Sequence, residues 1–225
     1  MTDQIIFDIE TKPVPEKVRE LYKFDRDSVK DKRIKDPAKL EAKKDEKEAE
    51  FYENKIAKAA LNPLTCEVCA IGYYYPKDDE YIIDDSNDFN EAAILERFWD
   101  AFTESRMGTE RLMIGWNTHE FDLPMIIIRS RILGVKIPAF VYETPMSRYF
   151  NGLFIDLMKV WVCNKFKEYE KLERVAKVLG VAQERKHNIE GKNFWKHLES
   201  DRENALQYLK DDLLECALIA EKIYC

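Results

Sequence analysis

The sequence predicts an α/β layer fold, in which helices pack against a sheet. Short runs rich in β-branched and aromatic residues, bounded by turn-forming residues, are typical of strands. Between them lie longer segments whose apolar residues recur three and four apart, as in amphipathic helices. The expected order along the chain is a strand, a hairpin, a helix, a strand, a helix, a strand and then helices.

The first strand is expected at about residues 4–10, where an apolar run leads into Asp8 and Glu10. Residues i and i+2 of a strand point to the same face, so these two carboxylates would lie side by side. Like charges in that position disfavour each other unless a positive charge lies between them. The pattern therefore predicts a bound metal ion.

Residues 12–63 differ from the rest of the chain because Lys, Glu and Asp dominate them. Asp36 as N-cap and Pro37 as the first helical residue predict an exposed helix over about residues 37–61. Four residues are expected to form a thin apolar stripe on this helix: Leu40, Phe51, Tyr52 and Ile56. The segment is interpreted as a solvated helical insertion within a single domain of residues 1–225. The alternatives are a cover over the functional site and a docking surface for a partner protein.

A hairpin is predicted next, with strands at residues 66–75 and 80–85 around a Pro-Lys-Asp-Asp turn. Ser86 or Asp88 is expected to cap the helix at residues 91–105. The later elements continue the alternation of strands and helices: a strand at 111–117, a helix at 121–134 closed by Gly134, a strand at 152–158, a helix at 168–181 ended by Gly180, and a helix at 202–224 capped by Asp201.

Composition limits the classes of function. Charged residues make up 35% of the chain and there are only seven glycines, which favours long charged helices. The net charge of -7 argues against a general affinity for nucleic acid or anionic membranes, although a local basic groove stays compatible with it.

No apolar run approaches the roughly 18 residues of a membrane span, and no apolar leader follows Met1. The five cysteines are an odd number, so reduced thiols and a cytoplasmic location are expected. Cys66 and Cys69 lie in a predicted strand, where positions i and i+3 point to opposite faces. They are interpreted as strand residues and not as a zinc or redox motif.

Two further acids, Asp122 and Asp212, also lie next to segments that are expected to be buried. Asp122 begins a helix directly after a buried strand, and Asn117 lies in the loop between them. Tyr208 and Asp212 are four residues apart on the last helix, hence on one face beside its apolar stripe. Asp211 points elsewhere and is expected to be solvated.

Taken together, FDIET at residues 7–11, N-x-x-x-FD at 117–122 and Y-x-x-x-D at 208–212 resemble the three motifs of the DEDD 3′–5′ exonucleases. The chain resembles their Tyr variant. The His variant would place a histidine one helical turn before the last aspartate, where this chain has Gln207 and Tyr208. His197 is interpreted as a surface or capping residue, and His119 as a loop residue that contacts substrate or is purely structural.

The stretches FDLPMIIIRSRILGVKIP, FIDLM and LERVAKVLGV extend the resemblance to stand-alone exonucleases related to the proofreading domain of family-B DNA polymerases. It covers residues 4–11 and about 64–224, and the insertion does not fit the pattern. The resemblance implies a ribonuclease H-like fold with a mixed five-stranded sheet flanked by helices, and the charged helical insertion after strand 1.

The resemblance also implies a site for two divalent metal ions, Mg²⁺ or Mn²⁺. In this scheme Asp8 bridges both ions, Glu10 and Asp212 complete one site, and Asp122 acts on the second ion, partly through water. Tyr208 hydrogen-bonds and orients the attacking water. A tyrosine with an ordinary pKa of about 10 is a poor general base at neutral pH, so its role is positioning.

Substrate contacts are expected near these carboxylates. The candidates share proximity to the site in sequence: Ile9, Thr11, Trp116, Asn117, Phe121 and Lys186, with Arg185 beside it. An aromatic wedge would suit a frayed 3′ end, since base stacking contributes about 1–3 kcal/mol per base. Core packing for the aromatic residues and solvation for the two basic residues are the alternatives.

The function expected from the resemblance is hydrolysis of phosphodiester bonds from the 3′ end of single-stranded DNA, with release of nucleoside monophosphates. The alternatives are a 3′–5′ exoribonuclease of ribonuclease D type, an endonuclease of related fold, and a non-catalytic binding or scaffold subunit. A separate polymerase or a repair or replication protein is the expected partner, through residues 12–63. No membrane partner is expected.

Overall fold

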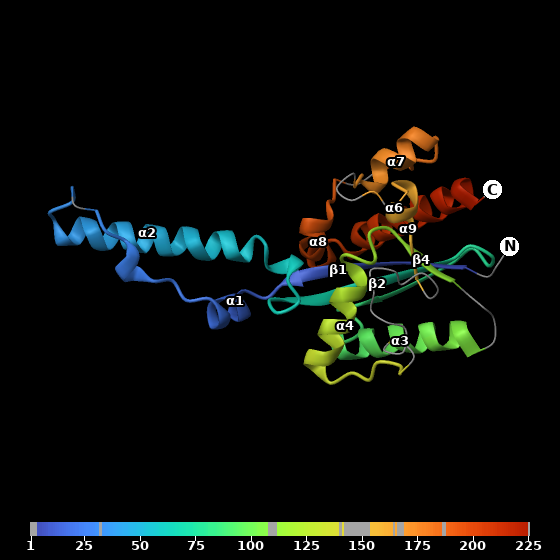
Figure 1. Ribbon diagram of the computed structural model, residues 1–225, viewed down its shortest axis with the longest axis horizontal. Helices are drawn as coiled ribbons and strands as arrows, with labels where there is room; N and C mark the ends of the chain where they lie inside the picture. The colour runs from blue at the N-terminus through green and yellow to red at the C-terminus, as the bar shows by residue number, and fades with distance from the viewer. Residues whose placement is uncertain are drawn as a thin grey trace. The chain divides into compact units, whose positions relative to one another are not determined.

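The computed structural model describes residues 4–31, 33–107, 112–139, 141, 154–163, 165, 169–185 and 188–224, with only the backbone at 105–107. The chain divides into two compact units (Figure 1). The larger unit contains the described residues up to Glu10 and those from Val68 onward. The smaller unit is Thr11–Glu67.

A mixed five-stranded sheet with the order β3-β2-β1-β4-β5 confirms the predicted fold class. Its strands in chain order are β1 (Gln4–Pro13), β2 (Cys66–Tyr75), β3 (Glu80–Asp85), β4 (Leu112–Gly115) and β5 (Phe154–Asp156). β1 pairs with β4 and β4 with β5 in parallel, whereas β2 and β3 form an antiparallel pair. The parallel strands therefore bring their carboxyl ends to one edge of the sheet, which is where such sheets place their ligands.

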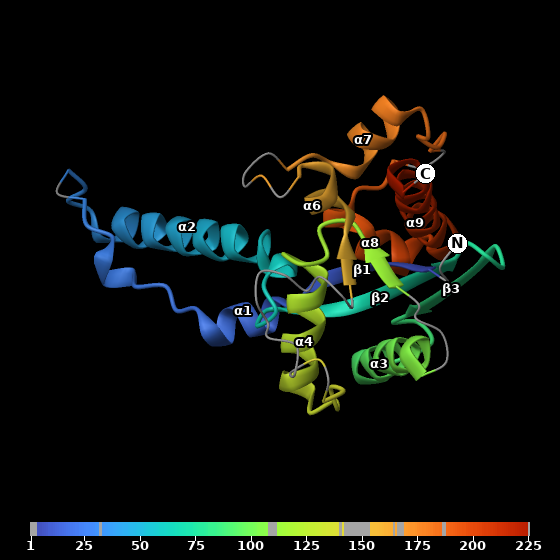
Figure 2. The same ribbon diagram turned by 45° about the vertical axis from the view of Figure 1, so that its right-hand side comes forward.

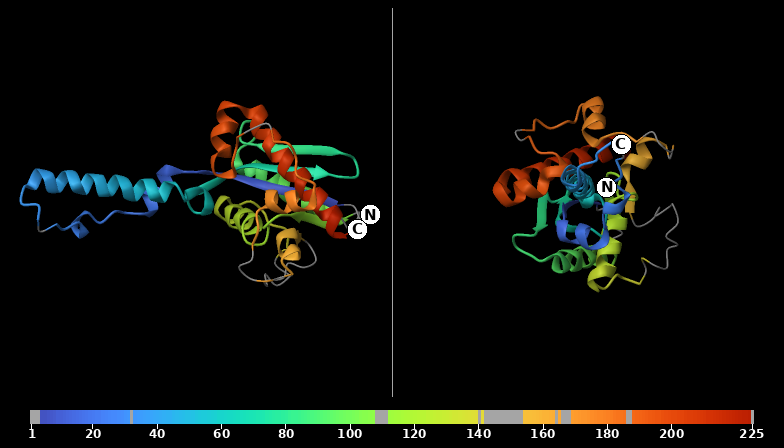
Figure 3. Two further views of the ribbon diagram at one scale, coloured as in Figure 1. Left: turned by 90° about the horizontal axis from the view of Figure 1, so that it is seen from above. Right: turned by 90° about the vertical axis from the view of Figure 1, so that its left-hand side faces the viewer.

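Helices cover both faces of this sheet (Figure 2). On one side lie α3 (Glu91–Met107) and α4 (Asp122–Leu133). On the other lie α6 (Leu157–Trp161), α7 (Leu172–Leu179), the short η3 (Gly191–Asn193), α8 (Phe194–Ser200) and α9 (Arg202–Tyr224). Seen from above, α9 lies across the sheet beside α8 (Figure 3).

Among the described residues, no helix is both long and apolar enough to cross a membrane.

The alternation of side chains along β1 separates two hydrophobic clusters. Phe7 points toward α3, and its ring lies 5.6 Å from that of Phe98 and 5.9 Å from that of Phe154. Ile6 belongs to the cluster on the opposite face, together with Leu209 and Leu213 of α9. Because Asp8 and Glu10 continue the Ile6 register, their side chains point toward α9.

Several helix ends agree with the sequence. Gly134 and Gly180 follow α4 and α7 with φ angles of 71° and 72°, the left-handed conformation that glycine favours at a helix C-terminus. Asp201 precedes α9, and Asp36 caps α2 by accepting a hydrogen bond from the amide of Ala38, 2.9 Å away. Cys66 and Cys69 are buried residues of β2.

Other boundaries differ from the prediction. The cap of α3 is Asn90 and not Ser86 or Asp88: its side chain accepts from the amide of Ala93, 2.9 Å away. The strand predicted at 152–158 ends at Asp156, because the Asp156 side chain accepts from the amides of Met158 and Lys159 and so begins a helix there. The extended stretch of β1 continues to Pro13, beyond the predicted end at residue 10.

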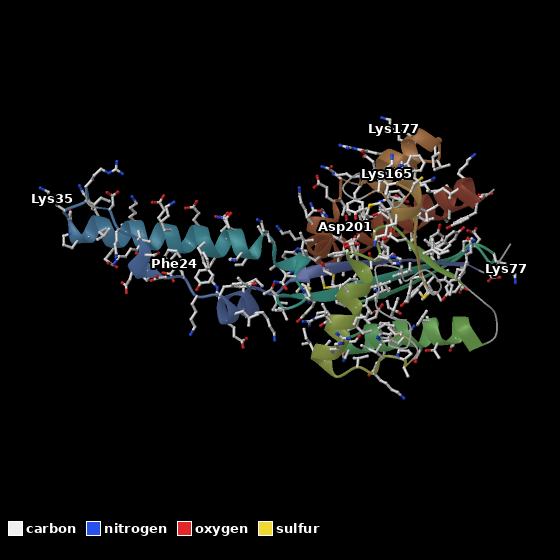
Figure 4. All side chains as sticks on the ribbon, viewed as in Figure 1. Phe24, Lys35, Lys77, Lys165, Lys177 and Asp201 are labelled. Carbon is white, nitrogen blue, oxygen red and sulfur yellow. The ribbon has the colours of Figure 1, made fainter. Side chains whose placement is uncertain are left out.

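The smaller unit contains α1 (Pro15–Leu21), η1 (Arg26–Ser28), α2 (Pro37–Ile56) and η2 (Ala59–Leu61). Within it Phe24, labelled in Figure 4, packs against Phe51 of α2 with ring centroids 5.4 Å apart. The guanidinium of Arg26 contacts three acids of α2: Glu41, Asp45 and Glu48. Part of the predicted apolar stripe therefore packs against the segment that precedes α2, through Phe51 and Tyr52. The helix ends at Ile56 and not at residue 61, because η2 follows it.

Candidate functional site

Three carboxylates from two elements converge at the sheet edge. Asp8 and Glu10 come from β1, and Asp212 comes from the face of α9 that covers the sheet. Each offers one oxygen, and these oxygens lie within 4.8 Å of one another. Glu10 and Asp212 are buried, whereas Asp8 is half-buried. Carboxylate oxygens at this spacing match the hard ligands that Mg²⁺ and Mn²⁺ prefer, so the donor set fits a divalent cation.

Asp122 joins this cluster from a third element, α4. It is the first residue of α4 and is buried, with 2% of its surface exposed. One of its carboxylate oxygens accepts a hydrogen bond from the backbone amide of Ile9, 3.2 Å away. The contact ties the start of α4 to the middle of β1, and so places Asp122 next to Asp8 and Glu10.

The carboxylates line a cavity of about 500 Å³. Its walls combine acids with apolar and aromatic side chains that come from β1, the loop after β4, α6, α7, η3 and α9. The predicted site residues on its lining are Asp8, Ile9, Glu10, Trp116, Asn117, Phe121, Asp122, Tyr208 and Asp212.

Burial raises the pKa of every carboxyl group in this cluster. For Asp8 and Glu10 burial contributes most, and the neighbouring carboxylates raise the pKa further. Burial raises the pKa of Asp122 to about 7 and that of Asp212 to about 6. The cluster therefore binds protons in the absence of other positive charge, and a metal ion would compete with those protons.

Tyr208 lies one helical turn before Asp212 and is also buried. Burial raises its pKa far above the ordinary value, and the nearby charges of Asp212 and Glu10 raise it further. Its hydroxyl donates a hydrogen bond to Asp212, an interaction that in turn lowers the pKa of that carboxyl. Tyr208 is thus a protonated hydrogen-bond donor at neutral pH and not a base.

A family model described as "predicted 3′–5′ exonuclease related to the exonuclease domain of PolB" matches residues 62–220. The chain belongs to this family. The matched stretch includes Asp122, Tyr208 and Asp212, and it begins after Asp8 and Glu10. It also leaves out nearly all of the smaller unit, Thr11–Glu67.

The fold of this exonuclease family member is similar to that of a solved structure, the family B DNA polymerase from the hyperthermophilic archaeon Pyrobaculum calidifontis. The TM-score is 0.60 at 17% identity, and the match covers 100% of this chain and 25% of the polymerase chain. The likeness supports the ribonuclease H-like fold. No curated protein matches the chain.

The remaining predicted residues take different places. Trp116 lines the cavity, and its indole N–H donates to the backbone oxygen of Glu170, 3.1 Å away. Thr11 belongs to the smaller unit, where its hydroxyl donates to the backbone oxygen of Ala60, 2.7 Å away. Lys186 lies outside the described residues. The guanidinium of Arg185 is neither fully solvated nor free to bind a phosphate, because it forms ion pairs with Asp212 and Glu215.

Asp156 is a site-organising residue that the sequence analysis did not single out. Its carboxylate accepts hydrogen bonds from the backbone amides of Asn117 and His119, at 3.0 and 3.1 Å. It thereby holds the loop between β4 and α4, which carries cavity residues. The imidazole of His119 lies 3.2 Å from the backbone oxygen of Phe154. This contact favours the structural role for His119 over a contact with substrate. The one sequence signal for Asp156 is an acid at the junction of a strand and a helix.

Gly191 lines the cavity next to Tyr208 and Glu10. A Cβ atom at this position would lie 3.6 Å from the Tyr208 hydroxyl and 3.7 Å from a carboxylate oxygen of Glu10. The absence of a side chain therefore leaves room beside the two residues that face the centre of the site.

Proposed function

We propose that this protein is a 3′–5′ exonuclease that hydrolyses phosphodiester bonds at the 3′ end of single-stranded DNA and releases nucleoside monophosphates. The observation that carries the proposal is the convergence of Asp8, Glu10 and Asp212 in one cavity with Asp122 and Tyr208. Membership of a family of predicted 3′–5′ exonucleases supports the polarity of the reaction.

The carboxylates would hold two divalent ions, Mg²⁺ or Mn²⁺. In this assignment Asp8 serves both ions, Glu10 and Asp212 complete one site, and Asp122 serves the second. When bound, such a pair of ions lowers the pKa of the attacking water and stabilises charge on the phosphate and on the departing 3′ oxygen. The raised pKa values of the carboxyl groups support this assignment, since four crowded acids require compensating charge.

Tyr208 would position the attacking water. Its single hydroxyl proton is donated to Asp212 and is kept at neutral pH, so the hydroxyl oxygen would accept a hydrogen bond from the water but would not take its proton. A fixed acceptor near the reacting phosphate restricts the orientation of the water, and orientation is a large part of catalysis in phosphoryl transfer.

Aromatic residues of the cavity wall would hold the terminal bases. Trp116 is half-buried and is fixed by its hydrogen bond to the backbone of Glu170, so one face of the ring is presented in a defined orientation. Phe121 lines the same cavity. Stacking on such rings is tolerant of sequence, which suits an enzyme that removes every nucleotide in turn.

The proposal assigns no catalytic role to the smaller unit. All the residues with a role belong to the larger unit, and residues 12–63 form an insertion in a single exonuclease domain. A partner such as a separate polymerase or a repair protein stays a prediction for this insertion. Replacing Arg26, which contacts three acids of α2, with alanine is expected to leave the rate on naked DNA unchanged.

The substrate is tested with 5′-labelled single-stranded DNA, matched RNA and circular single-stranded DNA, each with Mn²⁺, Mg²⁺ or EDTA. A metal-dependent ladder that shortens from the 3′ end of linear DNA supports the proposal. A ladder on RNA alone would retain the chemistry and change the substrate class, since contacts to the 2′-OH decide between the two. Cleavage of the circle would indicate an endonuclease.

A further inference from the structure

Arg185 lies in the segment after α7 and reaches the acidic cluster from outside the cavity. One guanidinium nitrogen is 2.5 Å from a carboxylate oxygen of Asp212 and 2.7 Å from one of Glu215. The other terminal nitrogen is 3.9 Å from Glu173. The Arg185 side chain is only 18% exposed, so these are shielded contacts and not surface ion pairs.

We propose that Arg185 is a positioning residue for the reaction: it fixes the carboxylate of Asp212 in the orientation in which Asp212 binds a divalent ion. The inference rests on the proposed function, which gives this ion its catalytic role. Arg185 itself does not contact the substrate. It replaces the phosphate contact that the sequence analysis considered for this residue.

The anchor of Arg185 is Glu215. This glutamate is almost fully buried, with 1% of its side chain exposed, and its second oxygen accepts a hydrogen bond from the backbone amide of Gln183, 3.0 Å away. Glu215 is therefore held from two sides and in turn holds the guanidinium. Asp212 and Glu215 are three residues apart on α9, so one planar guanidinium can bridge both carboxylates.

Asp212 is consequently fixed by two donors. Arg185 donates to one of its oxygens, and the Tyr208 hydroxyl donates to the carboxylate as well. The guanidinium carbon also lies 5.6 Å from the centroid of the Tyr208 ring, a distance at which cation and ring attract each other. One arginine thus contacts both residues of the Y-x-x-x-D pair, which is the arrangement expected of a partner that orients metal ligands.

A purely structural role would account for the same ion pairs, because the buried Glu215 needs a positive partner. The structural role and the positioning role are separated by removing the charge of Glu215 together with Arg185. In Arg185→Met the buried Glu215 loses its partner, which is expected to destabilise the fold. In the double variant Arg185→Met/Glu215→Gln the buried charge of Glu215 is removed together with its partner, so most of the lost stability is expected to return while Asp212 still lacks the Arg185 donor.

The test is Mn²⁺ binding without substrate, measured from the free Mn²⁺ signal in electron paramagnetic resonance. The double variant is expected to require about 10–100-fold more Mn²⁺ for half-saturation than wild type, the usual cost of losing a group that hydrogen-bonds a metal ligand. Arg185→Lys is expected to lie between the two, because lysine keeps the charge and loses the planar fork. The matched control is Arg174→Met on α7. The Arg174 side chain is 71% exposed and pairs with Glu170, and the variant should bind Mn²⁺ as wild type does.

Unchanged Mn²⁺ affinity in the folded double variant would overturn the proposal and leave Arg185 a structural residue. Wild-type protein that binds no Mn²⁺ would overturn it together with the proposed function. Wild-type protein that binds Mn²⁺ but leaves DNA intact would reject the proposed function alone, since the affinity difference between wild type and the double variant is measured without cleavage.

Discussion

The backbone amide of Ile9 donates a hydrogen bond to the carboxylate of Asp122, which lies 113 positions later in the sequence and 3.2 Å away in space. The donor lies between the two acids of β1, and the acceptor is the first residue of α4. The contact therefore fixes the spacing between the carboxylates of β1 and that of Asp122, before any ion binds.

Asp122→Asn is expected to separate charge from geometry, because asparagine retains an oxygen that can accept from Ile9. Exonuclease activity should fall by about 10²-fold or more, as is typical when a group at a reacting centre is lost. The metal-free protein should unfold at a higher temperature than wild type, since a buried charge is removed. The rate of DNA cleavage in Mn²⁺ measures the first effect, and thermal unfolding in EDTA measures the second. Asp100→Asn, at an exposed position of α3, is the control and should change neither.

The stability of the metal-free protein is expected to rise as the pH falls from about 8 to about 5. The folded-state pKa is about 7 for Asp122 and about 6 for Asp212, above the ordinary value of 3.8 for both. The buried charges therefore destabilise the folded state fully above the folded pKa, and proton uptake by the folded state removes this penalty as the pH falls.

Thermal unfolding in EDTA across this pH range measures the effect, and Asp122→Asn should show a smaller rise than wild type. Mn²⁺ should raise the unfolding temperature more at pH 8 than at pH 6, since the ligands must lose their protons to bind it. A difference between wild type and Asp122→Asn that stays constant with pH would contradict the expected titration.

Tyr208→Phe removes one hydroxyl from the site and leaves the carboxylates in place. The rate is expected to fall by about 10²-fold, within the range for loss of a positioning or acid–base group. Mn²⁺ affinity should fall less than in the Arg185 double variant, because the charged donor Arg185 still holds Asp212. Single-turnover rates and Mn²⁺ titration measure the two quantities. Tyr224→Phe, on the same helix at a 52%-exposed position, is the control. A parallel loss of rate and Mn²⁺ affinity would instead assign Tyr208 to the binding of metal.

Gly191→Ala tests the space beside the carboxylates. The added methyl group would make ordinary contacts, 3.6 Å from the Tyr208 hydroxyl and 3.7 Å from Glu10, so the fold should be retained. The rate should fall by up to about 10²-fold, because a displacement of about 1 Å at the reacting atoms can cost that much. Circular dichroism and single-turnover rates measure the outcome. Wild-type activity in this variant would show that the space at Gly191 is not used.

The elements that local patterns specify were predicted well. α9 begins and ends where the apolar stripe and the preceding Asp201 indicate, and Gly134 and Gly180 end their helices as predicted. The i, i+2 spacing of Asp8 and Glu10 was enough to predict that they share a face, because strand geometry alone determines it.

Contacts between distant segments could not be predicted in the same way. Arg185 has no local feature that distinguishes it from a solvated residue, and its partners lie on a helix that starts many positions later. The choice of Asn90 over Ser86 or Asp88 as helix cap depends on how the chain leaves β3, where Asp85 already accepts from the amide of Asn87. Asp156 likewise organises a loop that only the parallel pairing of β4 and β5 brings beside it.

The most direct test of the central claim compares wild type with Asp8→Asn on 5′-labelled single-stranded DNA in Mn²⁺, at equal concentrations of folded protein. If the carboxylate cluster carries the activity, wild type yields a ladder that shortens from the 3′ end, and the variant yields none on the same time scale. An equal ladder from Asp8→Asn would place the activity elsewhere, and intact DNA with Mn²⁺-loaded wild type would reject the proposed exonuclease activity on DNA.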